Sequence, residues 1–272
     1  MKNLMDVLPR NLRMTLAYDG THYVGWQTQA NGLAIQEVIE KAIWKLTKEN
    51  VSLLSTGRTD SGVHALGQVA SFRTLSRIPA DGMHKAIQNF LPDDILIRDM
   101  SEAHPKFHAT FSAKYKRYRY VINNGRTNSP FFRQYSWHFF ASLDVQAMHE
   151  AAQVIVGKQD FRSFETHWPN KATSVRTVMS LTVQRQRFCP LWFNAADMPP
   201  STDNVGDYIW IEIVADGFLY NMVRTIVGTL VSVGRGRWDG GDVRRIIDTM
   251  DRTVAGDTAP PQGLYLVDVC YD

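Results

Sequence analysis

The chain has 272 residues, a length that can bury a substantial core in one large or two modest domains, with the composition of an ordinary globular protein. No apolar run is long enough to span a bilayer, no signal-peptide stretch is apparent, and the two cysteines have neither metal-site nor disulfide-framework spacing. We therefore expect a cytoplasmic protein without a membrane segment, and its net charge of +3 excludes neither acidic nor neutral partners.

The first part of the chain predicts the element order β-α-β-β-α-β. Residues 12–19 read as a strand, and apolar residues then repeat at helical spacing from Ile35 to Leu46. We expect further strands over 51–55 and 68–72, a short helix over 83–90 that is stopped by Pro92, and a strand over 95–98. This order is that of ferredoxin-like folds.

The second part predicts the same order of elements without repeating the residues. We expect a strand over 117–122 that pairs with 135–139, and then a helix that is capped by Asp144. The alternating strands are predicted at 175–183 and 208–214, the next helices at 219–233 and 243–250, and a closing strand at 264–271. The segment 186–207, which is rich in proline and polar residues, predicts a long exposed loop.

These patterns predict an α+β fold made of two ferredoxin-like (βαββαβ) halves. The N-terminal half would cover residues 1–110 and the C-terminal half residues 111–272, with the join near 105–112. Antiparallel sheets of the two halves would abut, and a basic active-site cleft would lie between them.

The most informative segment is the loop 55–64, because it places Asp60 between two glycines. Gly57 and Gly62 permit backbone angles that other residues avoid, so a ligand can approach the bend closely. Ordinary turn chemistry is the alternative explanation for an Asp-Ser-Gly triplet. Aspartic proteases carry the same triplet, but they need two carboxylates, and the chain has no second Asp-Ser-Gly or Asp-Thr-Gly. We predict that Asp60 is displayed as a catalytic side chain.

Positive charge is concentrated in two stretches that lack acidic residues, 103–143 and 166–196. Such segregation favours a polyanionic partner, although a solvated basic face is the alternative. The first stretch carries Lys106, Lys114, Lys116, Arg117, Arg119, Arg126 and Arg133, and the second carries Lys171, Arg176, Arg185 and Arg187. Aromatic residues interleave with the first set, and unstacked bases bind to such surfaces, so we expect an RNA partner.

Two further side chains complete the predicted site. Arg224 stands beside a broad apolar stripe in the helix predicted at 219–233, where an arginine either reaches out to water or meets a carboxylate. Asp60 is the carboxylate that we choose as its partner. Strand alternation places Tyr118 and Tyr120 on one face, opposite Arg117, and we expect Tyr120 to be core and Tyr118 to face a ligand.

Residues 57–65, Gly-Arg-Thr-Asp-Ser-Gly-Val-His-Ala, closely resemble the catalytic motif of the tRNA pseudouridine synthase A family. The resemblance covers nearly the whole chain, from about Leu12 to Tyr271. It is also carried by the segments 18–21 with 25–27, 111–113 with 117–120, 160–164, 222–228 and 263–266. The chain departs from the family at Asn221, where many members have histidine, and in its long 186–207 segment.

The resemblance implies an isomerase that converts uridine to pseudouridine at positions 38, 39 and 40 of the tRNA anticodon stem-loop, without a cofactor or a metal. Asp60 would be the essential nucleophile, although the residues leave open which atom it attacks. Tyr118 would stack on the target and take part in proton transfer, and Arg224 would form the ion pair with Asp60. A homodimer would present one basic surface to the tRNA.

The resemblance also implies that Arg58 helps to hold the flipped nucleotide, and we expect further RNA contacts from Lys114, Lys116 and Arg117. A non-catalytic RNA-binding protein of similar fold is the alternative function. Charge and aromatic residues fit both, but a binder gains nothing from a carboxylate aimed at a phosphate-rich ligand. Asp60 therefore favours the enzyme.

Overall fold

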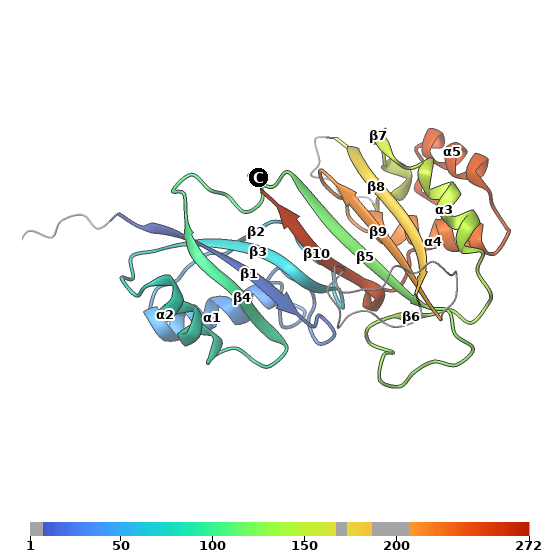
Figure 1. The fold of residues 1–272 in the computed structure, drawn as a ribbon. Helices are drawn as coiled ribbons and strands as arrows, with labels where there is room; N and C mark the ends of the chain where they lie inside the picture. The colour runs from blue at the N-terminus through green and yellow to red at the C-terminus, as the bar shows by residue number, and fades with distance from the viewer. Residues whose placement is uncertain (1–7, 167–172, 187–206, 272) are drawn as a thin grey trace, which may run out of the picture. The chain divides into compact units, whose positions relative to one another are not determined.

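The computed structural model describes residues 8–166, 173–186 and 207–271. Contacts divide the chain into two compact units, unit 1 with Met1–Lys114 and Leu266–Asp272, and unit 2 with Tyr115–Tyr265. Each unit combines antiparallel strands with helices, so the fold mixes α and β elements as predicted (Figure 1). The domain boundary expected between residues 110 and 111 stays a prediction. Within the described ranges, no helix is long and apolar enough to cross a membrane.

Unit 1 is a sheet covered by two helices. In chain order its elements are β1 (Arg10–Tyr18), α1 (Ile35–Thr47), β2 (Leu54–Ser55), β3 (His64–Thr74), α2 (Ala80–Gln88), β4 (Ile95–Ala103) and most of β10 (Leu264–Cys270). The strands lie in the order β4-β1-β3-β10, and β2 pairs with β3. The pairings β1–β3, β1–β4 and β2–β3 are antiparallel.

The two helices of unit 1 lie together on one face of these strands (Figure 1). Helix α1 turns Ile35, Ile39 and Ile43 into the core, as the helical spacing of the sequence predicts. It ends at Lys48, which adopts a left-handed φ of 60°. The sheet side of the core is supplied by the alternating buried residues of β1, among them Leu12 and Met14.

Strand β3 is longer than the 68–72 predicted, and it lies between β1 and the C-terminal strand β10. The backbones are so close that a Cβ on Gly67 would lie 2.4 Å from the carbonyl oxygen of Val267. Strand β2 is correspondingly shorter than the predicted 51–55 and has only two residues. The chain after β2 leaves the sheet to form the Asp60 loop.

Unit 2 has a sheet in the order β5-β9-β8-β7 and three α-helices in its described part. Its elements are β5 (Tyr115–Asn123), β6 (Trp137–His138), α3 (Val145–Gln153), β7 (Gly157–Asp160), β8 (Val175–Gln186), β9 (Tyr208–Ala215), α4 (Met222–Gly234) and α5 (Gly240–Thr249), with short 3-10 turns at Arg162–Phe164, Arg252–Val254 and Pro261–Gly263. Helix α3 packs on β8 and α4. The predicted pairing of 117–122 with 135–139 is present as a two-residue parallel bridge from β5 to β6.

Two local signals decide where helices of unit 2 begin. Asp144 caps α3 as predicted, and its side chain accepts a hydrogen bond of 3.0 Å from the backbone of Ala147. Helix α4 begins at Met222 rather than at the predicted residue 219, because Asn221 adopts a left-handed φ of 62°. Of the predicted 186–207 loop, residues 187–206 lie outside the described part of the chain.

Candidate active site

The Asp60 loop runs between β2 and β3, and buried polar side chains of the sheet form hydrogen bonds with it. The hydroxyls of Tyr18 and Thr59 share a hydrogen bond of 2.8 Å, and the Gln68 amide donates to the carbonyl of Gly57 at 2.8 Å. Tyr18, Thr59 and Gln68 are all buried. Two strands of the sheet, β1 and β3, therefore fix both sides of the loop's first half.

The segment that follows β1 contacts the backbone of the loop on its other side. Trp26 donates its backbone N–H to the Thr59 carbonyl at 3.0 Å, and Gly25 forms an isolated antiparallel bridge with Asp60. Gly25 has a φ of 110°, and a Cβ there would lie 2.5 Å from the Thr59 carbonyl oxygen. Only glycine allows this approach. The backbone of Asp60 is thus clamped, while its side chain stays half-buried and Arg58 is exposed.

His64 and Asp19 close the loop at its exit. The backbone of Gly20 donates to Nδ1 of the buried His64 at 3.0 Å, and a carboxylate oxygen of Asp19 lies 3.1 Å from the same nitrogen. Gly20 also lies flat against the loop, because a Cβ there would meet the carbonyl oxygen of Val63 at 2.0 Å. In the sequence, segment 18–21 was notable only for its family resemblance. Its tertiary contacts show that it forms one wall of the loop.

Burial determines the protonation of the tyrosine beneath the loop. Desolvation raises the pKa of Tyr18 to about 12, although hydrogen bonds from Thr59 and Gln68 oppose the shift. Tyr18 therefore keeps its proton over the whole physiological range, and its hydroxyl remains available to hydrogen-bond Thr59.

Tyr118 and Tyr120 lie on one face of β5 in unit 2. The Tyr118 ring is 7% exposed and meets the ring of Phe218 edge to face, with 4.9 Å between the centroids. Tyr120 lies in the core, as predicted, and its hydroxyl donates to the Pro260 carbonyl at 2.7 Å. Burial raises the pKa of Tyr120 well above its ordinary value, and the charge of Arg224 opposes this. Arg224 is therefore close to the face of β5 that carries both tyrosines.

The opposite face of β5 carries Arg117 and Arg119, which both point toward Glu212 on β9. Their guanidinium nitrogens lie 3.8 Å and 3.2 Å from the same carboxylate oxygen. Arg119 is buried and stacks over the Trp210 ring at 3.9 Å. The predicted alternation is present, so Arg117 points away from the Tyr118 face, and its RNA contact stays a prediction.

Arg224 is half-buried near the start of α4 and is oriented by two acceptors. Its Nε donates to the carbonyl of Ala259 at 2.6 Å, and one terminal nitrogen donates to the side chain of Asn221 at 2.9 Å. The Asn221 amide in turn donates to the hydroxyl of Thr166 at 3.0 Å. Sequence reasoning gave Asn221 no role beyond its departure from the family, because the partnership depends on its left-handed backbone.

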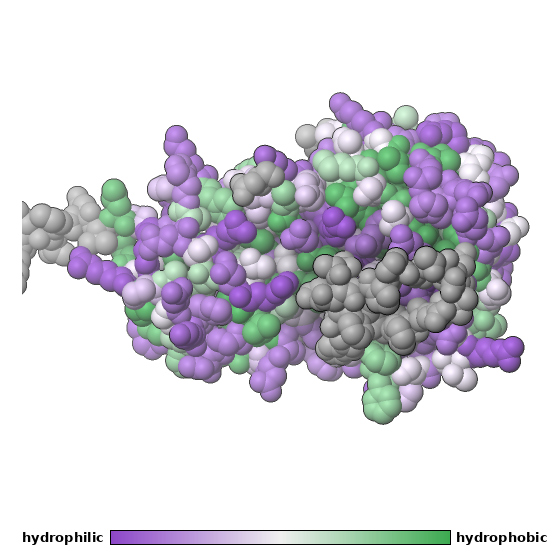
Figure 2. All heavy atoms as spheres, in the orientation of Figure 1, coloured by the Kyte–Doolittle hydropathy of each residue, from purple (hydrophilic) through white to green (hydrophobic). Residues whose placement is uncertain are grey.

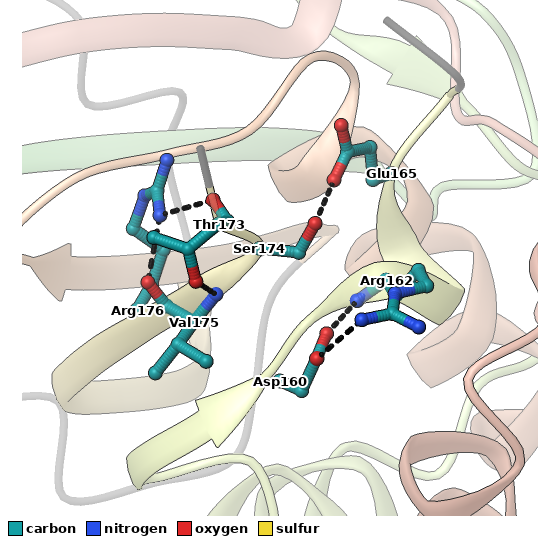
Figure 3. Close-up of polar contacts among 7 residues, drawn as sticks. All are labelled: Asp160, Arg162, Glu165, Thr173, Ser174, Val175 and Arg176. Atoms are coloured by element: carbon teal, nitrogen blue, oxygen red, sulfur yellow. Dashed lines mark hydrogen bonds and ion pairs between the residues drawn. The ribbon is translucent and has the colours of Figure 1, made fainter. Parts of the chain in front are cut away.

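Lys116 lies two residues before Tyr118 on the same face of β5 and is half-buried. Burial, with a smaller contribution from the charge of Arg176, lowers the pKa of Lys116 from 10.5 to about 8. Arg176 is itself fixed, since it donates to the carbonyls of Thr173 and Val175 at 3.0 Å and 2.6 Å (Figure 3). Two cations are therefore close together near Tyr118.

Ordered polar contacts surround the start of β8, where Arg176 lies. Ser174 donates to the buried Glu165 at 2.6 Å, and Asp160 accepts from both the backbone and the guanidinium of Arg162 at 3.0 Å (Figure 3). These bonds fix the 160–165 segment, which the sequence marked as a family block.

The remaining predicted RNA contact in the basic stretch, Lys114, is exposed at the end of unit 1, and its backbone donates to Cys270 at 2.8 Å. Asp60 belongs to unit 1, whereas Tyr118 and Arg224 belong to unit 2. The pairing of Asp60 with Arg224 stays a prediction. Across the described residues there is no group of three His, Cys, Asp or Glu side chains that could hold a metal ion.

Comparison with known proteins gives one consistent result. A family model described as tRNA pseudouridine synthase matches residues 14–112 and 151–272. Asp60 and Arg224 lie in the matched ranges, and Tyr118 lies between them.

Relatives named tRNA pseudouridine synthase A match along almost their entire length. The relative from Thermoanaerobacter sp. is 44% identical over 262 residues, which cover 96% of this chain and 100% of the relative. The relative from Acetivibrio thermocellus is 43% identical and that from Brevibacillus brevis 41% identical, with the same coverage.

Proposed function

The chain belongs to the tRNA pseudouridine synthase family, and from that premise we propose which residues carry out its reaction and where on the tRNA they act. It is an isomerase that converts uridine in tRNA to pseudouridine. The target uridines are those at positions 38, 39 and 40 of the anticodon stem-loop, in accord with the family resemblance of the Asp60 motif. A tRNA substrate implies that the enzyme works in the cytoplasm.

The reaction exchanges one bond of the ribose for another. The bond between C1′ of the ribose and N1 of uracil breaks, the base turns, and a new bond forms from C1′ to C5. N1 gains a proton and C5 loses one, so atoms and charge balance without a cofactor. Asp60 acts as the nucleophile that holds the nucleotide while the base is detached, as a carboxylate does in retaining glycoside hydrolysis.

The observation that supports this role is the clamped backbone of Asp60. Hydrogen bonds from Tyr18, Gln68 and Trp26 fix the loop, and Gly25 allows the close approach. A turn that served only to join β2 and β3 would not need three separate supports. Rigid placement of a reacting group is one of the larger contributions that an enzyme makes to rate.

Tyr118 and Arg224 supply the other two proposed roles. Tyr118 stacks on the target base and relays the proton that leaves C5, which its position on β5 beside Lys116 supports. Arg224 keeps Asp60 ionised, and its orientation by Asn221 and Ala259 supports a fixed ion-pairing role.

RNA contacts come from Arg58, Lys114, Lys116 and Arg117, because a target within a stem must be extruded and its distorted backbone held by cations. Following the family resemblance, we also propose two ferredoxin-like halves that meet in a basic cleft, and a homodimer that binds one tRNA. The order β4-β1-β3, with β2 on β3, supports the ferredoxin-like description of the first half.

The test compares Asp60→Asn with wild type on unmodified tRNA transcripts. We expect Asp60→Asn to bind tRNA and to form no pseudouridine, because the amide keeps the shape of the carboxylate but is no nucleophile. Chemical mapping of pseudouridine gives both the turnover and the positions modified. Asp99→Asn, at an exposed position of β4, is the matched control and should keep full turnover.

Residual pseudouridine formation by Asp60→Asn would refute the proposed role of Asp60 as the nucleophile. Modification of uridines outside positions 38 to 40 would refute the proposed target. If the wild-type protein binds tRNA but modifies no uridine, the result would support the alternative that it is a non-catalytic RNA-binding protein.

A further inference from the structure

The loop of residues 125–135, which we call the aromatic–basic loop, projects from the end of β5 and returns to β6 (Figure 1). Phe131 on this loop is 83% exposed, and Arg126 and Arg133 are exposed on either side of it. In Figure 2, apolar atoms project at the lower edge of the molecule, where Figure 1 draws this loop. The loop therefore presents an exposed aromatic ring together with two exposed cationic side chains.

The base of the loop is fixed by buried polar contacts. Gly125 donates its N–H to the side chain of Asn123 at 3.0 Å, and its carbonyl lies 3.1 Å from Nε2 of His138. The Asn124 amide donates to the carbonyls of Phe139 and Ala141 at 2.7 Å and 2.8 Å. The exposed tip is therefore presented on an ordered support, which lowers the entropy that a partner must overcome on binding.

The charge of the loop selects an anionic partner. The chain has no acidic residue from 103 to 143, so every charged residue near Phe131 in the sequence is basic. Asp207 lies against Gly125 at the base, but it also lies near the guanidinium of Arg185. Two exposed arginines on the same loop as an exposed aromatic ring, with Arg133 held by the carbonyl of Pro130, are suited to phosphates and to the face of a base or ribose.

The length of strand β5 gives the distance, within unit 2, between the loop and Tyr118, the residue proposed to relay the proton. Tyr118 is five residues before Asn123, the last residue of the strand, which corresponds to about 17 Å at roughly 3.3 Å per residue. The loop therefore lies several nucleotides along the RNA from a base stacked on Tyr118. It is too far to touch the target and within reach of the same stem.

We propose that the aromatic–basic loop is a second contact for tRNA, separate from the target nucleotide. Arg126 and Arg133 bind phosphates of the stem next to the target, and Phe131 packs on a ribose or base. This inference rests on the proposed function, and it adds affinity and placement of the stem rather than chemistry.

The test measures tRNA affinity and turnover of three loop variants: Phe131→Ala, Arg126→Gln with Arg133→Gln, and all three changes together. Phe131→Ala should weaken binding about tenfold, because stacking on one aromatic ring contributes about this much. The double arginine variant should lower the slope of log Kd against log salt by about 1.5, since each phosphate contact contributes roughly 0.7 to 0.9. Turnover at saturating tRNA should stay within about twofold of wild type in all three.

Phe90→Ala and Arg77→Gln are the matched controls, because they change an exposed phenylalanine and an exposed arginine of unit 1. Both should keep wild-type affinity and salt slope. If the loop variants keep them too while wild type forms pseudouridine, the second contact is refuted and the proposed function stands. If Phe131→Ala instead changes the oligomeric state in light scattering, the loop is a protein contact and the RNA proposal is overturned.

Discussion

Tyr18 is a residue outside the Asp60 motif that helps to decide where Asp60 lies. Its hydroxyl pairs with Thr59, the neighbour of Asp60, inside the core of unit 1. Because burial raises the pKa of Tyr18 to about 12, this hydrogen bond is independent of pH over the working range of an enzyme. Its effect on catalysis would act through position alone.

We predict that Tyr18→Phe lowers kcat about tenfold to a hundredfold with little change in KM, because a small displacement of the loop moves Asp60, the proposed nucleophile. Leaving Thr59 without its partner also costs about 1–3 kcal/mol of stability. Steady-state kinetics and thermal unfolding measure the two effects. Tyr23→Phe is the control, since it removes the side-chain bond of 2.6 Å to Asp94 and keeps the backbone contacts of Tyr23 with Ser61 and Gly62 of the loop. Equal loss of kcat in both variants would assign Tyr18 a merely structural role.

Lys116 loses its charge at a lower pH than an ordinary lysine does. With a pKa of about 8 in the free protein, it loses its proton as the pH rises through 8, whereas an ordinary lysine stays charged to about 10.5. A bound phosphate favours the protonated form, so the loss of tRNA affinity should appear above pH 8.

We predict that wild-type affinity for tRNA falls between pH 7 and pH 9 more steeply than that of Lys116→Arg, because arginine stays charged at both values. Lys116→Gln should bind more weakly at pH 7 and show the smallest further change. Fluorescence anisotropy with labelled tRNA measures all three. Wild-type affinity of Lys116→Gln at pH 7 would show that Lys116 does not contact RNA.

At the scale of elements, the start of α4 combines a strained backbone with a functional contact. Asn221 has a φ of 62°, and its side chain accepts from Arg224 and donates to Thr166. Asparagine tolerates this conformation better than most residues, so one side chain both begins the helix and orients the arginine. Two substitutions separate these roles.

We predict that Asn221→Gly keeps stability close to wild type, because glycine suits a positive φ, while Asn221→Ala is less stable than Asn221→Gly by about 1–2 kcal/mol. Both variants should lose activity to a similar degree, because both leave Arg224 with the Ala259 carbonyl but without the amide. Urea unfolding and pseudouridine formation report the two effects. Full activity of Asn221→Gly would show that Asn221 does not orient Arg224.

Elements with strong local patterns were predictable from sequence. The apolar spacing of residues 35–46 identified α1, and alternation identified β8 and β9. Strand β7 was not predicted, because Gly157–Asp160 is short and polar and is held by pairing with β8. The premature start predicted for α4 has the same cause, since tertiary contacts stabilise Asn221 in a conformation that the pattern does not reveal.

The candidate site was predictable only in part, for a related reason. Glycines beside Asp60 are visible in the sequence, and they indicated a displayed carboxylate. The support from Tyr18 and Gln68 depends on strands β1 and β3 being neighbours, which no local pattern encodes. Thr166 and Ala259, which complete the surroundings of Arg224, likewise approach it only in the folded unit.

At the scale of the whole molecule, unit 1 depends on residues that follow unit 2 in the chain. Leu266 and Val269 of β10 are buried in unit 1, and the Tyr271 hydroxyl donates to Ala109 at 2.8 Å and pairs with Thr56. Thr56 is the first residue of the Asp60 loop after β2. The C-terminal strand is thus part of the frame of the loop.

We predict that removal of residues 266–272 destabilises unit 1 in particular, because each large apolar side chain lost from a core costs about 1.5–3 kcal/mol and the edge of β3 is left unpaired. Limited proteolysis should then cleave within residues 8–114 well before it cleaves unit 2. Removal of Asp272 alone serves as the control. Equal protection of unit 1 in the truncated and intact proteins would contradict the prediction.

The position of β10 also has a consequence for how the protein is made. A ribosome releases the first hundred residues long before it reaches Leu266. The sheet of unit 1 therefore lacks strand β10 until all of unit 2 has been translated. Pairing across so long a separation in sequence is slow. The Asp60 loop therefore has all of its supports only once synthesis has passed β10, and a chain whose translation stops earlier lacks the contact between Tyr271 and Thr56.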